Sequence, residues 1–142
     1  MDKNILFQKF ITFTTAVHQV THDMTKDVRS ESLTPVQYKI LEYIAVSQPV
    51  TLSEISDCMH MSMPNTSREL RKLTEKHLCE KVADAEDRRK QSIRLSNEGH
   101  AMMGEVFQRI ESQLAQRIGT VSDEELKEIE RALDVLMSRV FY

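Results

Sequence analysis

The sequence predicts a mainly α-helical fold with one small β-hairpin. The chain of 142 residues has only 3 Gly and 3 Pro, and it is 40% hydrophobic and 29% charged. That composition suits a helix-rich globular domain. Apolar residues recur at helical spacing towards both ends, and short polar helix starts lie between them. A chain of this length buries roughly 70% of its unfolded surface without a disulfide or metal.

The two ends of the chain carry the same apolar pattern. Steps of three and four residues are typical of a helix that packs along another helix. The N-terminal set is Leu6, Phe10, Phe13, Val17, Val20 and Met24, and the C-terminal set is Leu126, Ile129, Leu133, Leu136 and Val140. We therefore expect a long amphipathic helix at each end.

Several helices begin at a short polar residue that accepts from the first-turn backbone N–H groups. Thr34 with Gln37 and Thr51 with Glu54 fit the capping box, and Ser62 and Ser122 provide similar starts. The helices predicted from these signals are 35–47, 52–59, 62–76 and 123–140.

Residues 79–95 change to alternation, because Ile93 and Leu95 are separated by polar positions. A charged segment, DAEDRRKQ, lies in the middle, which predicts a hairpin with a charged tip. Ser96 then opens a long helix that ends at Gly119.

Charge is unevenly distributed along the chain. The net charge is −3, which by itself argues against nucleic-acid binding. Residues 61–95, however, contain nine Lys or Arg and six Asp or Glu, so this segment carries +3 and the remainder −6. The positive segment indicates an anionic partner.

Helix 52–59, a short turn at His60-Met61 and a helix from Ser62 have the dimensions of a helix-turn-helix. Its expected core is Leu52, Ile55, Met59, Leu70 and Leu73. The second helix offers base-edge and phosphate-binding side chains, and the hairpin tip adds a basic wing. The candidate DNA-binding residues are Ser62, Asn65, Ser67, Arg68, Arg71, Lys72, Asp87, Arg88, Arg89 and Lys90. A solvated polar face is the alternative for the helix alone, and the adjacent wing favours DNA.

The run from Leu73 to Gly99 resembles the recognition-helix end and wing of the MarR family of bacterial regulators. Its most specific parts are Asp87-Arg88-Arg89 and RLSNEG at 94–99. The resemblance implies a winged helix-turn-helix lobe at 34–96 and dimerisation helices at 1–33 and 97–142 within a single domain, 1–142. It also implies that Asp87 orients the wing and that Arg89 enters the minor groove.

One residue departs from the family pattern: His77 stands where such sequences usually have Gly. The position is expected to need a left-handed backbone, which His tolerates better than most residues.

The expected function is that of a cytoplasmic, homodimeric repressor that binds a pseudo-palindromic operator in double-stranded DNA and is relieved by a small-molecule effector. No cofactor and no membrane span are expected. An enzyme is not expected either, since Gly-rich phosphate loops, nucleophile elbows and HExxH motifs are missing from the sequence.

Three alternatives remain open. His18 and His22, at i and i+4, have the spacing of metal ligands, but no third ligand is evident. Cys58 and Cys79 lack CxxC pairing and are expected to be buried small hydrophobes, with a thiol switch as the alternative. A winged helix that serves as a protein-interaction module is the third.

Overall fold

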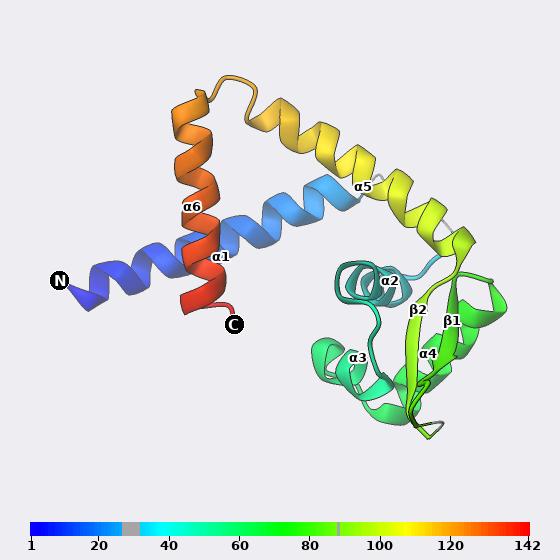
Figure 1. Ribbon diagram of the computed structural model, residues 1–142. Coiled ribbons are helices and arrows are strands. Elements are labelled where there is room, and N and C mark those ends of the chain that lie inside the picture. The colour runs from blue at the N-terminus through cyan, green and yellow to red at the C-terminus, as the bar shows by residue number, and fades with distance from the viewer. Residues whose placement is uncertain (27–31, 88) are drawn as a thin grey trace. The chain divides into compact units, whose positions relative to one another are not determined.

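The protein is described by a computed structural model at residues 1–26, 32–87 and 89–142 (Figure 1). These residues form six helices and two strands, which confirms the predicted fold class. The elements are α1 (Lys3–Thr25), α2 (Pro35–Ser47), α3 (Leu52–Met59), α4 (Met63–Glu75), β1 (Cys79–Ala83), β2 (Gln91–Leu95), α5 (Asn97–Arg117) and α6 (Asp123–Arg139). The chain divides into two compact units, residues 1–110 and 111–142.

The predicted helix starts are confirmed at atomic detail. Thr34 Oγ1 accepts from Gln37 N at 3.1 Å, and Thr34 N donates to Gln37 Oε1 at 3.3 Å. Thr51 and Glu54 repeat this box at 3.1 and 3.3 Å. Ser62 Oγ accepts from Asn65 N at 3.2 Å. The helices therefore begin where the local sequence encodes a cap.

The core of the first unit lies between α2, α3, α4 and the hairpin. α2 packs on α3, α4 and β2, whereas α4 packs on α3 and β1. Its fully buried apolar side chains are Ile40, Leu41, Ile44, Val50, Ile55, Leu73 and Met103. Leu52 and Met59, which were expected in the core, are only partly buried at its edge.

The hairpin is antiparallel, with Cys79 opposite Leu95 and Ala83 opposite Gln91. The far edge of β2 is also paired, because Val50 and Ile93 exchange two backbone hydrogen bonds, of 3.0 and 2.6 Å. This pairing attaches the wing to the helical lobe.

A close backbone approach fixes the junction of hairpin and α5. Ser96 N donates to Leu78 O at 3.1 Å, and Ser96 Oγ accepts from Gly99 N at 3.0 Å. A Cβ at Gly99 would lie 2.0 Å from Leu78 O. Only glycine fits there without a shift of the backbone.

Two histidines adopt left-handed backbone conformations. His77 has φ 61°, as expected for a residue in place of glycine, and His60 has φ 53° as the C-cap of α3. His60 therefore makes the sharp turn between α3 and α4.

The expectation for Cys58 is wrong, whereas that for Cys79 is confirmed. Cys79 is buried and Cys58 is exposed. The buried face of α3 is centred on Ile55 and Ser56, and Cys58 lies to the side of it. The face that α3 turns towards the core therefore determines whether Cys58 is buried.

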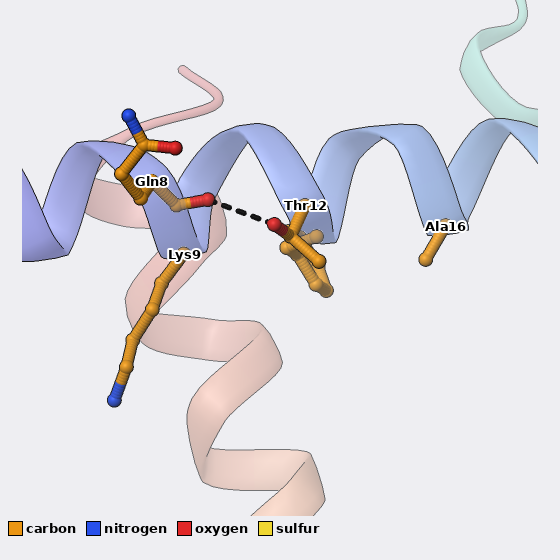
Figure 2. A pocket seen from close by; sticks show the side chains of 5 residues that line it. Gln8, Lys9, Thr12 and Ala16 are labelled. Atoms are coloured by element: carbon orange, nitrogen blue, oxygen red, sulfur yellow. Dashed lines mark hydrogen bonds between the residues drawn. The ribbon is translucent and has the colours of Figure 1, made fainter.

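Helix α1 contains no fully buried residue, and its apolar side chains include Leu6 at 54% and Phe7 at 57% exposure. Figure 2 shows a shallow depression on α1, where Thr12 Oγ1 donates to Gln8 O at 2.9 Å. Its lining is Gln8, Lys9, Thr12, Phe13 and Ala16. All of these belong to one helix, so the depression is an uncovered helix face.

In the second unit, α6 also lacks fully buried residues, and Ile129 and Leu133 are 42% and 55% exposed. Among the described residues, no helix has the length and apolar character needed to cross a membrane.

Candidate nucleic-acid interface

Helix α4 presents one face to the core and the opposite face to solvent. Thr66, Leu70 and Leu73 are buried on the inner side. The predicted contacts on the helix are exposed, except for Ser67, which is half-buried: Ser62, Asn65, Ser67, Arg68, Arg71 and Lys72. The structure thus brings all of the predicted α4 residues onto one accessible helix. Asn65, Arg68 and Lys72 follow at three and four residues, so they share a face.

The cations of α4 differ in their partners. Lys72 Nζ lies 3.3 Å from Glu69 Oε1, with its side chain 51% exposed. Arg68 and Arg71 take part in neither of the two ion pairs that the described residues form. Their exposed side chains are therefore available for phosphate or base-edge contacts.

The wing tip is held by Asp87. Its Oδ1 accepts from Arg89 N at 3.0 Å, and its backbone carbonyl accepts from Lys90 N at 3.0 Å. Asp87 is half-buried, whereas Arg89 and Lys90 are exposed. The acid thus folds the tip while the two cations face solvent. Arg88, also predicted as a contact, lies outside the described residues.

A second aspartate completes the tip. Asp84 Oδ1 accepts from Glu86 N at 2.9 Å, and Asp84 N donates to Lys90 O at 3.0 Å. The two aspartates of the DAEDRRKQ segment therefore accept backbone hydrogen bonds, which explains their presence beside cations.

Sequence reasoning missed two features of this surface. Arg94 Nε donates to Glu80 Oε1 at 2.8 Å across the hairpin. Gln37, identified only as a capping residue, also contacts Glu69 of α4, with 3.2 Å between Nε2 and Oε2. Both partnerships join residues distant in sequence, so no local pattern indicates them.

The sensing alternatives at Cys79 and at the His18–His22 pair find little support in the geometry, whereas the exposed Cys58 leaves a thiol switch open at that residue. Burial raises the pKa of the Cys79 thiol, although a bond to Thr74 opposes the effect. A raised pKa disfavours the reactive thiolate. No group of three potential metal ligands occurs among the residues that the structure describes, and His18 and His22 are exposed on α1.

A short helix, a tight turn, an exposed polar helix and a basic-tipped antiparallel hairpin define a winged helix-turn-helix protein. Residues 33–90 match the model of the MarR family. The HTH-type transcriptional regulator YsmB of Bacillus subtilis is 28% identical over 102 residues, which cover 72% of this chain and 70% of YsmB. The lobe of the chain that contains α2, α3, α4 and the start of the hairpin is therefore similar to the MarR family. The curated relatives are transcription regulators, and the fold is that of a DNA-binding winged helix-turn-helix.

Solved structures support the same fold. A MarR family protein from Bacillus stearothermophilus has a TM-score of 0.77 at 22% identity and covers 100% of this chain and 99% of its own. MepR of S. aureus bound to ethidium bromide has a TM-score of 0.65 at 21% identity, with 89% and 94% covered. A MepR mutant bound to an oligodeoxyribonucleotide has a TM-score of 0.58 at 23% identity, with 92% and 96% covered.

Proposed function

We propose that the protein is a homodimeric repressor that binds a pseudo-palindromic operator and is released by a small-molecule effector. The observation that carries this proposal is the pairing of two exposed basic features. Arg68 and Arg71 project from α4, and Arg89 projects from a tip held by Asp87. A recognition helix in the major groove and a wing on the adjacent minor groove use this combination.

Within this proposal the two elements have different roles. Asn65 and Arg68 read base edges from the N-terminal half of α4, where the side-chain chemistry suits adenine and guanine. Ser62, Ser67, Arg71 and Lys72 contribute phosphate and supporting contacts. Arg89 enters the minor groove, where a narrow A·T-rich segment concentrates negative potential. Arg88 and Lys90 add charge beside it.

The dimer is proposed from the two apolar helix faces. Residues 1–33 and 97–142 form the dimerisation region, and residues 34–96 form the DNA-binding lobe. The exposed apolar side chains of α1 and α6 support this division, since exposed apolar stripes of such length are covered in stable proteins. Two recognition helices related by a two-fold axis would lie about 34 Å apart on successive major grooves.

The dimer is tested by deleting residues 1–28. An obligate interface of this kind buries upwards of about 2,000 Å², so the truncated chain should lose dimerisation and most of its fold. Sedimentation and circular dichroism measure both properties. A well-folded monomer from the truncation would refute the proposed division.

Effector control is supported by MepR, which is described in complexes with an oligodeoxyribonucleotide and with ethidium bromide. Release of DNA requires that an effector bind better to a dimer state in which the recognition helices do not fit the grooves.

The function is tested by selecting genomic fragments with the purified protein and footprinting the enriched sequence. The expected result is one protected site with two related half-sites about 10 base pairs apart, or a multiple of that spacing. Failure to enrich any fragment over random duplex at moderate salt would refute sequence-specific binding.

A further inference from the structure

A cluster of polar side chains joins the start of α2 to the C-terminal half of α4. At its centre lies Gln37, which is only 3% exposed. Its Nε2 donates to Glu69 Oε2 at 3.2 Å, and its Oε1 accepts from Lys76 Nζ at 3.1 Å and from Thr34 N at 3.3 Å. A buried amide is costly unless it is bonded, so these partners fix its orientation.

The cluster extends at both ends. The second carboxylate oxygen of Glu69 accepts from Lys72 Nζ at 3.3 Å. Lys76 Nζ also donates to the backbone carbonyl of Ser32. A continuous set of hydrogen bonds therefore runs from the backbone where the chain enters the lobe, through Gln37, to two charged residues of α4.

The apolar contacts of α4 do not by themselves fix the rotation of this helix about its axis. Leu70 and Leu73 are the buried apolar residues of the helix, with Thr66 beside them. Burial of a single apolar stripe is non-directional, and it sets the depth of a helix more closely than its rotation. Hydrogen bonds of about 3 Å are directional, so they restrict rotation.

We propose that Gln37, Glu69 and Lys76 form a polar clasp that positions the recognition helix. Gln37 is the positioning residue: it sets the rotation of α4 against α2, and thereby the direction in which Arg68 meets DNA. Lys76 ties the same helix to the entry of the lobe at Ser32. The inference rests on the proposed function, because the rotation of α4 matters to specificity only if α4 reads bases.

Capping and positioning by Gln37 are separable. The cap needs only an acceptor for Thr34 N, and a Glu at this position of a capping box provides one equally well. Positioning needs the Nε2 donor that faces Glu69. Gln37→Glu therefore keeps the cap and replaces the donor with a second carboxylate opposite Glu69.

The experiment compares Gln37→Glu, Glu69→Gln and the double variant on the selected operator fragment and on random duplex. Gln37→Glu should bind the operator at least about 10-fold more weakly, about 1.4 kcal/mol, because like charges replace a hydrogen bond. Binding to random duplex should change less than about 2-fold, since no phosphate contact is removed. The double variant should recover most of the loss, because the amide introduced at position 69 donates to the carboxylate introduced at position 37.

Lys76→Met supplies a second test that leaves the Gln37 side chain itself unchanged and removes one of its hydrogen-bond partners. It should weaken operator binding by about 3-fold or more relative to Lys39→Met, a matched loss of one exposed lysine on α2. This pair decides the question if Gln37→Glu does not fold by circular dichroism.

The clasp would be overturned by a folded Gln37→Glu variant that binds the operator like the wild type, or by a double variant that recovers nothing. Equal binding by the two lysine variants would do the same. Failure of the wild type to select any operator would instead refute the proposed function itself, so the two failures are distinguishable.

Discussion

The close approach of Leu78 to Gly99 predicts that the same substitution has opposite effects on stability at two positions of α5. Gly99→Ala and Gly104→Ala both add a methyl group to α5. A Cβ at Gly104 would meet nothing within 4 Å, whereas a Cβ at Gly99 would lie 2.0 Å from Leu78 O and 3.0 Å from Leu78 C. The same chemical change therefore meets open space at one site and backbone at the other.

The magnitudes follow from these distances. Gly→Ala in a helix gains up to about 1 kcal/mol of propensity, which is the whole expected effect at Gly104. At Gly99, forced packing costs about 1–3 kcal/mol. Displacing Leu78 O would also weaken its hydrogen bond from Ser96 N, worth about 1 kcal/mol. Gly99→Ala should therefore destabilise the protein by about 2 kcal/mol.

Urea denaturation followed by circular dichroism, at equal protein concentration for both variants, measures the free energy of unfolding. The two variants should change it in opposite directions, with a difference of about 3 kcal/mol. If Gly99→Ala stabilises the chain as much as Gly104→Ala does, the junction of wing and α5 is not packed as described.

Three further predictions concern the DNA-facing lobe. Arg68→Ala should cost about 1–3 kcal/mol on the operator and relax base preference at one symmetric pair of positions, measured by competition with operator variants; equal losses on random DNA would reassign the side chain to phosphate binding. Arg89→Ala should weaken operator binding at least about 10-fold. Asp87→Ala should weaken binding by a smaller factor, because the tip loses its support while Arg89 remains; tighter binding by Asp87→Ala would refute the role of Asp87 in holding the tip. Because burial raises its pKa, Cys79 should stay a thiol at pH 8 and alkylate more slowly than the exposed cysteine of α3, a difference that peptide mass spectrometry measures and that equal rates would contradict.

Local sequence encoded much of this fold. The Thr34 and Thr51 caps could be predicted because each box joins residues three apart, and the structure contains both. These caps depend on neighbours in the chain, which a sequence displays directly. The left-handed backbone at His77 was instead expected from the resemblance to the MarR family, whose sequences usually have Gly at that position.

The remaining features depend on tertiary contacts. The exposure of Cys58 follows from the direction in which α3 packs, which composition does not determine. The Arg94–Glu80 pair requires the hairpin register, and the contacts of Gln37 with α4 bridge more than thirty positions. For the candidate site, sequence therefore indicated which cations lie on α4 and the wing and that Asp87 holds the tip, but not that Glu69 pairs with Lys72 or Glu80 with Arg94.

The central claim is that this winged helix-turn-helix binds duplex DNA specifically, and a salt titration of binding to the selected operator tests it most directly. The logarithm of the association constant should fall linearly with the logarithm of salt concentration, by about 0.9 for each phosphate contacted, because bound counterions are released. At about 150 mM salt the operator should still bind at least about 1,000-fold more tightly than random duplex. An affinity independent of salt, or equal for operator and random duplex, would contradict the account.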